Sequence, residues 1–282
     1  NGSIDAYGNG RNYFDGIDIG AIEATKVVAK NISELYVNSS VSGGDKTGST
    51  WANAMPNLAD ALQWVLRMNN NYTAANPLKI YVAKGIQNPM YSSDARIHRN
   101  SSGKPESDNS NEKIDSEFEV DLNGNARNHS FFIPNNVHII GNYDAATGRK
   151  LNSENGHSET ILSGLAHDSR HIVVAANRNN KVVDARIENV VIENGNGFGS
   201  GDLDGISQYY GGGVYVDNAV LNLKNVVVRN NKANERGGGI YLEGDDAKVY
   251  LSNSLVYNNT SVGDGSALYS NNDAKTNIIN ST

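Results

Sequence analysis

The chain has 282 residues, 38% of them hydrophobic and 20% charged, and a formal net charge of −7. This apolar content can bury a full core, as one large domain or an elongated solenoid, so general disorder is not the expectation. Lysine and arginine form no basic stripe, which argues against a nucleic-acid partner, and the lack of cysteine excludes thiol catalysis, thiolate metal sites and disulfides.

The first strongly periodic segment is PNLADALQWVLRM, which begins at Pro56. Its apolar residues recur at helical spacing: Leu58, Ala61, Leu62, Val65 and Leu66. Asn57 can cap this helix, and Asp60 is favourable in its first turn. We expect a short helix that covers the N-terminal end of the fold and protects unpaired sheet edges there. KIYVAKG, from Lys79, is then interpreted as the first strand.

The stretch of residues 91–130 is polar, charged and poor in core residues. It is too long for an ordinary connection, so we interpret it as an insertion. Such long loops are either functional or disordered, and the sequence leaves both open. No apolar run anywhere approaches the roughly 20 residues that span a bilayer, so we expect no direct membrane insertion.

Strand-like segments follow the insertion: NHSFFIPNNVHIIGNYD from Asn128, ETILSGL from Glu159, and HIVVAANRNNKVVDARIENVVIENG from His171. We interpret them as successive turns of one coil, because each has short runs of alternating apolar residues bounded by Asn or Gly. Residues 152–158 and 196–210 are predicted to be loops that bulge from the coil.

The last third of the chain contains an internal repeat. GGGVYV begins at Gly211, GGGIYL at Gly237 and GSALYS at Gly265, so the units are 26 and 28 residues apart. Each unit is predicted to hold two short strands, and stacking the units would bury their apolar residues in one column. The predicted fold is all-β, a right-handed parallel β-helix. We expect two ladders of stacked residues, one made of Val214, Ile240 and Leu268, the other of Val190, Val226 and Leu255.

The segment YVNSSVSGGDKTGSTWANAMPNLADAL resembles the opening of bacterial cell-surface β-helix proteins, and KIYVAKG, SFFIPNNVHIIGNYD, ETILSGL and ARIENVVIENGNG follow in the same order as in that family. The GGG-Ile/Val-Tyr units are also similar to the repeats of polymorphic outer-membrane proteins and related adhesins. The resemblance implies a pectate-lyase-like superhelix on an exported bacterial protein, often one module of a long surface chain. It implies no single activity.

GIDIGAIE, residues 16–23, resembles the strand with which such β-helices usually end. We therefore interpret residues 1–30 as an N-terminal segment that finishes a preceding β-helix, or that pairs at an end of this coil or of a neighbouring molecule. Residues 31–282 are predicted to be the β-helix domain, truncated at its C-terminal end. Neighbouring modules of a longer chain are then expected partners.

Three tyrosines occupy equivalent positions in the repeats: Tyr215, Tyr241 and Tyr269. Each follows an inward aliphatic residue, so the period of two in a strand turns them outward into a stacked stripe. Such a stripe can hold sugar rings. The alternative is that the tyrosines tighten the ladder or sit beneath a loop.

The alternation in KVVDARIENVV places Asp184, Arg186 and Glu188 on one outward face. Carboxylates there could serve as acid and base, or hold Ca²⁺ beside an arginine that stabilises an anionic intermediate. The alternative is a set of weak charge pairs on a solvated strand.

No metal site is predicted. His157, His167 and His171 lack metal-ligand spacing and are expected on the surface or in loops. The segments GDLDG from Gly201 and DLNGN from Asp121 offer oxygen donors, so Ca²⁺ is the one cofactor that the sequence leaves open, but neither continues as an EF-hand loop. Trp51 is expected to pin the N-terminal cap to the first turns of the coil.

These patterns favour a non-enzymatic, adhesin-like or scaffold module, located outside the cell or on a bacterial surface. Its expected partners are an extracellular glycan, a host or surface protein, or the next module. The alternative is a carbohydrate-active enzyme on the same fold, a polysaccharide lyase or glycoside hydrolase. Catalysis would need convergent carboxylates in a concave site, and the sequence shows only scattered charges.

Overall fold

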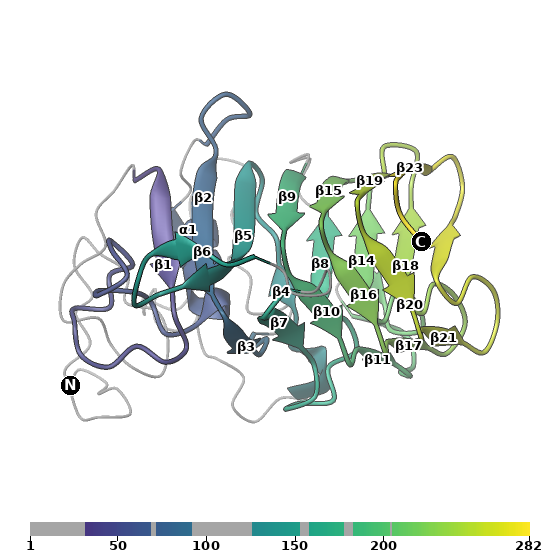
Figure 1. Cartoon of the computed structure of the whole chain (residues 1–282). Coiled ribbons are helices and arrows are strands. Elements are labelled where there is room, and N and C mark those ends of the chain that lie inside the picture. Colours follow the sequence, from purple (N-terminus) through teal and green to yellow (C-terminus); the bar gives the residue numbers. More distant parts are fainter. Residues whose placement is uncertain (1–31, 69–71, 92–125, 153–157, 178–182, 204) are drawn as a thin grey trace, which may run out of the picture.

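A computed structural model describes residues 32–68, 72–91, 126–152, 158–177, 183–203 and 205–282. Within them the chain forms the predicted parallel β-helix, in which short strands stack in chain order along one axis (Figure 1). The strand-like segment at residues 16–23 and most of the insertion at residues 91–130 lie outside the described residues.

Four parallel sheets form the walls of the coil in the described residues. The long sheet contains β1 (Glu34–Val37), β2 (Leu78–Ala83), β5 (Val137–Asp144), β9 (Asp184–Glu188), β15 (Val220–Lys224), β19 (Lys248–Ser252) and β23 (Lys275–Ile279). The β7 sheet contains β3 (Gly85–Gln87), β7 (Thr160–Ser163), β10 (Val191–Glu193), β16 (Val227–Arg229) and β20 (Leu255–Tyr257).

The other two walls are smaller. The β14 sheet contains β4 (Phe131–Phe132), β8 (Val173–Ala176), β14 (Val214–Asp217), β18 (Ile240–Glu243) and β22 (Leu268–Ser270). The β17 sheet contains β11 (Asn196–Gly197), β17 (Lys232–Ala233) and β21 (Thr260–Ser261). Outside the walls, β6 (Arg149–Lys150) pairs with β5, and β12 (Asp202–Leu203) pairs with β13 (Ile206–Ser207), both antiparallel. A 3₁₀ turn, η3, spans Ala126–Asn128.

A complete turn of the coil, here called a rung, therefore carries four strands, for example β14, β15, β16 and β17. The expectation of two strands per unit is wrong. The reason is that strands of two or three residues, such as β16 and β17, are too short to show an alternating pattern and are hidden between the Asn and Gly residues of the turns.

Register confirms one predicted ladder and corrects the other. Val214 pairs with Ile240, and Ile240 with Leu268. Leu255, however, pairs with Val227, one residue away from its predicted place. The inward position of that rung belongs to Ser254, whose hydroxyl accepts a hydrogen bond from the Val226 N–H at 3.0 Å. A slip of one residue turns Leu255 to the opposite face of the sheet.

The many asparagines of the chain have a structural role at the corners of the coil. Residues with positive φ recur at equivalent positions: Asn189, Asn225, Asn253 and Asn280 after the long sheet, and Asn194, Asn230 and Asn258 after the β7 sheet. Asparagine tolerates this left-handed conformation better than other side chains except glycine. Each such residue turns the chain sharply from one wall into the next.

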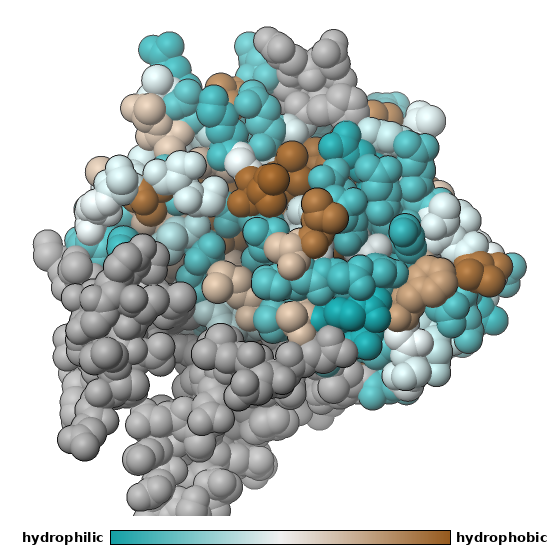
Figure 2. Space-filling view, turned by 90° about the horizontal axis from the view of Figure 1, so that it is seen from below, coloured by the Kyte–Doolittle hydropathy of each residue, from teal (hydrophilic) through white to brown (hydrophobic). Residues whose placement is uncertain are grey.

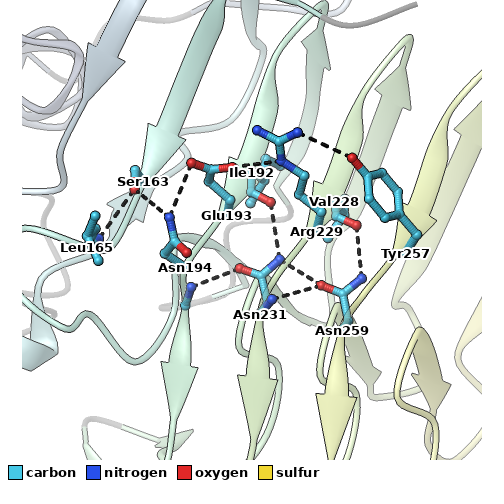
Figure 3. A network of polar contacts seen from close by, with 11 residues as sticks. Ser163, Leu165, Ile192, Glu193, Asn194, Val228, Arg229, Asn231, Tyr257 and Asn259 are labelled. Atoms are coloured by element: carbon cyan, nitrogen blue, oxygen red, sulfur yellow. Dashed lines mark hydrogen bonds and ion pairs between the residues drawn. The ribbon is translucent and has the colours of Figure 1, made fainter.

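A second set of asparagines lies inside the coil. Asn231 is fully buried; its side chain accepts a hydrogen bond from the Gly195 N–H at 2.9 Å and donates to the Ile192 carbonyl at 3.1 Å and to the Asn259 side chain at 3.0 Å. Asn259 in turn donates to the Val228 carbonyl at 2.9 Å. Figure 3 shows these two amides side by side on successive rungs, where they tie the turns together.

The predicted helix is present as α1 (Leu58–Met68). Its apolar side packs with the N-terminal end of the core, where Leu58, Leu62 and Trp64 are buried. The N-H of Leu58 donates to the Gln87 side chain at 2.9 Å, which satisfies one of the free donors at the helix start. The first strand in the described residues is β1, not KIYVAKG as expected, because ELYV comes earlier and pairs with β2.

Candidate functional site

The tyrosine stripe of the repeats lies beneath a loop. Tyr215 and Tyr241 point away from the central core, as the period of two predicts, but both are fully buried. The β12–β13 hairpin and the residues after it cover them: Ile206 packs into the same cluster, and the Tyr210 ring stacks on Tyr241 with centroids 4.6 Å apart. Only Tyr269, stacked on Tyr241 at 5.9 Å, is partly exposed.

The hydroxyl groups of this stripe are also occupied. Tyr215 and Tyr241 both donate to the Glu243 carboxylate, Tyr241 at 3.1 Å. Burial, together with the nearby Glu243 charge, raises the pKa of both phenols well above their usual value. The stripe therefore fits the alternative, a ladder tightened beneath a loop, and offers no open platform for sugar rings.

Asp184, Arg186 and Glu188 do lie on one outward face of β9, alternating with the buried Ala185 and Ile187. Arg186 Nε forms an ion pair with Glu188 Oε1 at 2.5 Å, so this arginine already has an anionic partner. Asp184 and Glu188 are four residues apart on one strand, which separates their backbone positions by roughly 13 Å at about 3.3 Å per residue. Paired glycosidase carboxylates lie within about 9.5 Å of each other, so these two do not form such a pair.

His171 is buried, so it is not the surface histidine that was one of the two expectations; it lies in the connection just before β8. Its Nδ1 lies 2.9 Å from the Gly211 carbonyl oxygen, and its ring lies 5.3 Å from Tyr215. Burial lowers the pKa of this imidazole to about 4, because the charged form would lose its hydration. His171 thus acts as a neutral packing residue beneath the stripe.

This lowered pKa makes a prediction about acid stability. The unfolded chain takes up a proton at His171 near pH 6.5, whereas the folded chain does so only near pH 4. The free energy of unfolding should therefore fall by about 3 kcal/mol over that interval because of this residue alone. In His171→Asn the fall between pH 7 and 4, measured by urea unfolding, should be smaller by that amount. An unchanged pH dependence would contradict the assignment.

The described residues contain no group of three or more His, Cys, Asp or Glu side chains that could hold a metal ion. Of the two segments that suggested Ca²⁺, residues 121–125 and residue 204 lie outside the description. His167 lies beside His129 with ring centroids 5.1 Å apart, and His157 is outside the described residues.

The outer face of the β7 sheet carries an apolar column. Figure 2, seen from below, shows hydrophobic side chains gathered between hydrophilic ones. The column consists of Ile86, Ile161, Val191, Val227 and Leu255, aligned by strand register. Val191 and Val227 are 1% and 2% exposed, so the column meets solvent mainly at Ile86, which is 55% exposed, and in part at Ile161 and Leu255. Such a narrow apolar strip offers little contact area to a ligand.

Beside this column runs a polar one. Arg229 Nε lies 2.8 Å from Glu193 Oε2, and its guanidinium donates to the Tyr257 hydroxyl at 3.3 Å (Figure 3). These contacts raise the pKa of Arg229, first through Tyr257 and then through Glu193. The charges on this face pair with one another along the stack.

The outer face of the long sheet carries a closed ring of aromatic side chains near the N-terminal end. The aromatic tetrad consists of Tyr36 on β1, Tyr81 on β2, Tyr143 on β5 and Trp51 in the loop before α1. Centroid distances around the tetrad are 5.0 Å (Tyr36–Trp51), 5.6 Å (Trp51–Tyr143), 5.3 Å (Tyr143–Tyr81) and 5.4 Å (Tyr81–Tyr36). All four side chains are partly exposed.

Two backbone features place Tyr143 and Trp51 in the tetrad. The register of β2 and β5 shifts between Tyr81 and Ala83, so that Ala83 faces Tyr143 and the Tyr143 ring comes to lie beside Tyr81. Such an irregularity commonly redirects a side chain. Trp51 is held by a loop that forms hydrogen bonds with β1. The Tyr36 N–H donates to the Gly48 carbonyl and the Met55 N–H donates to the Tyr36 carbonyl, both at 2.9 Å.

Glu34 completes the site. Its Oε2 accepts a hydrogen bond from the Tyr36 hydroxyl at 3.1 Å, and its Oε1 accepts one from the Tyr81 hydroxyl at 3.2 Å. Desolvation and then the Glu34 charge raise the pKa of Tyr81 to about 12. Both phenols are therefore neutral donors at physiological pH, and the carboxylate is fixed between them.

The sequence patterns did not reveal the tetrad. Trp51 does contact the first rungs through Tyr36 and Tyr143, in line with the expected pinning role. The other rings come from three strands with no shared motif, one of which, β1, was not expected. The only signal was a tyrosine in each of ELYV, KIYVAKG and HIIGNYD at an outward or strand-end position.

No helix in the described part of the chain has the length and hydropathy to cross a membrane. In comparisons with known proteins, no family model matches the chain, and no curated protein or solved structure matches it either.

Proposed function

We propose that this β-helix is a non-enzymatic carbohydrate-binding module, and that the aromatic tetrad is its contact with glycan. The observation that carries this is the closed arrangement of four partly exposed rings on the outer face of a continuous sheet. A pyranose ring has an apolar face of C–H groups that packs on an aromatic ring, and tyrosine and tryptophan add hydrogen-bonding groups at its rim. Beyond the tetrad the same sheet continues through β9, β15, β19 and β23, along which a long glycan could extend.

The geometry disfavours hydrolysis at the same place. Glu34 lies on β1 and Glu188 on β9, three strands apart in the sheet. At about 4.8 Å per strand the two carboxylates are separated by roughly 14 Å, beyond the range of paired glycosidase carboxylates. Arg186 and Glu188 are also paired with each other, which leaves them less available for catalysis. We therefore propose that this face binds a glycan without cleaving it.

The proposed setting is the surface of a bacterium, with the module as part of a longer exported chain. The ordered sequence segments that resemble bacterial surface β-helix proteins support this setting, and so does the solenoid architecture. An adhesin-like role follows, in which the long sheet contacts a glycan of a host or of a neighbouring cell; a protein partner at the tetrad is the competing outcome.

A binding assay tests the proposal. Trp51→Ala and Tyr81→Ala should each weaken binding to polysaccharides that retain the wild-type chain by at least about tenfold, or 1.4 kcal/mol, since each removes a stacking surface. Tyr250→Ala is the matched control, because Tyr250 is 42% exposed on β19 of the same sheet but outside the tetrad. Affinities would be measured by calorimetry after a glycan array selects the ligand.

Thermal unfolding of each variant separates lost binding from lost folding. If the tetrad variants melt like the wild type yet bind glycans as tightly, the tetrad is not the site. Release of reducing or unsaturated sugars from any bound polysaccharide would overturn the non-enzymatic proposal and favour a lyase or hydrolase.

A further inference from the structure

Glu34 places a negative charge next to the tetrad. Stacking of a neutral sugar on the aromatic rings would not require this charge. Each of the Glu34 carboxylate oxygens accepts one phenol hydrogen bond, at 3.1 Å and 3.2 Å. A carboxylate offers about four acceptor positions, so two remain for a ligand. The two phenols also fix its orientation, and a group that binds there meets a preorganised anion.

Aromatic faces and a carboxylate together favour a cation. The negative face of an aromatic ring attracts an ammonium group within about 6 Å of its centroid, with tryptophan the strongest. Glu34 contacts the hydroxyl ends of Tyr36 and Tyr81, so an ammonium that pairs with Glu34 lies at the rim of the tetrad, beside these two rings. A sugar that carries an amino group combines this cation with an apolar C–H face.

The cations near the tetrad are exposed or already paired, and they include Lys150, the exposed cross-strand neighbour of Tyr143. Lys79 is the cross-strand neighbour of Glu34, but its side chain is exposed, and exposed pairs are weak enough for a ligand to displace. Arg186 pairs with Glu188 at 2.5 Å. Of the two carboxylates whose charge acts on Tyr143, Glu188 is therefore neutralised, whereas Glu34 is held by neutral phenols.

We propose that the tetrad selects glycans with free amino groups, such as polymers of glucosamine, over neutral and anionic glycans, and that Glu34 is the residue that sets this preference. The inference rests on the proposed function and deepens it. N-acetylation of the same sugar would remove the cation and keep the ring face, and a uronic acid would place a like charge against Glu34.

The test compares three hexasaccharides on the wild-type chain by calorimetry: glucosamine, N-acetylglucosamine and galacturonic acid. We expect glucosamine to bind at least about tenfold more tightly than its acetylated form and galacturonic acid to bind most weakly. In Glu34→Gln, which keeps the shape of the side chain, the glucosamine advantage should fall to about twofold, while affinity for the acetylated sugar stays within twofold. Asp245→Asn, an exposed carboxylate distant in sequence, should change neither.

The outcomes separate the two proposals. If the acetylated and free amino sugars bind equally, or if Glu34→Gln weakens all three ligands alike, the selectivity is wrong while carbohydrate binding stands. If no hexasaccharide or array glycan binds, or if only a protein does, the carbohydrate proposal fails and the selectivity fails with it. If Asp245→Asn also loses the preference for glucosamine, that preference comes from the overall charge of the chain and not from Glu34, and the selectivity proposal is wrong.

Discussion

Gly195→Ala is expected to cost at least about 4 kcal/mol of unfolding free energy, or to prevent folding. A Cβ at this position would lie 1.8 Å from the carbonyl oxygen of Gly212 and 2.5 Å from its carbonyl carbon. Overpacking usually costs about 1–3 kcal/mol, because side chains can shift aside. Here the obstacle is the backbone of the adjacent wall, which is held in its own ladder, so the cost should exceed that range.

Gly43→Ala is the control for this experiment. Gly43 has a φ of +79°, but nothing lies within 4 Å of its Cβ position. Its replacement should cost only the strain of a left-handed residue, about 1–2 kcal/mol. Urea unfolding of both variants would decide: a loss in Gly195→Ala no larger than that in Gly43→Ala would contradict close approach of the walls as the reason for the glycine at position 195.

The same close packing explains the GGG motif of the repeats. The sequence reveals the motif but not why glycine is required there. A Cβ on Gly212 would lie 2.1 Å from the Lys232 carbonyl oxygen, and one on Gly213 would lie 2.5 Å from the Gly239 carbonyl oxygen of the next rung. The third repeat reads Gly-Ser-Ala at residues 265–267. In the described chain no further rung packs on those residues, so side chains are tolerated there.

The architecture was predictable because it is periodic. A repeat of 26 to 28 residues with outward and inward residues in phase specifies one stacked ladder, and Val214 and Ile240 indeed pair. The covering of Tyr215 was not predictable to the same degree, because the covering hairpin is a single insertion, absent from the later repeats. Local alternation tells which way Tyr215 points, but not what folds over it.

The tetrad escaped prediction for a similar reason. Tyr143 reaches its place only through a register shift after Tyr81, and Trp51 only through loop contacts with the edge of β1. A strand pattern read with strict alternation carries neither piece of information. The proposed binding surface of this solenoid therefore lies where the repeat is broken, and at such positions periodicity does not predict the structure.

The buried asparagines Asn231 and Asn259, here called the interior asparagine ladder, are expected to contribute strongly to stability. Asn231→Ala should lower the unfolding free energy by about 4 kcal/mol, because the Gly195 N–H and the Ile192 carbonyl both lose a buried partner, at about 1–3 kcal/mol for each group left unsatisfied, and a small cavity is added. Ile192 lies on β10 of the β7 sheet and Gly195 lies at the turn that leads into the β17 sheet, so the loss loosens this corner. The fold has no hydrophobic substitute there, since the backbone groups remain polar.

Asn222→Ala is the matched control. Asn222 lies on β15 and turns its amide outward, where it makes only long contacts, to the Asp184 carboxylate at 3.3 Å and to the Ala185 carbonyl at 3.4 Å. Its loss should stay within about 0.5 kcal/mol, as for most surface positions. A loss of less than about 1 kcal/mol for Asn231→Ala, measured by urea unfolding beside this control, would show that water or a backbone shift satisfies the corner, and that the ladder is a consequence of the coil instead of one of its causes.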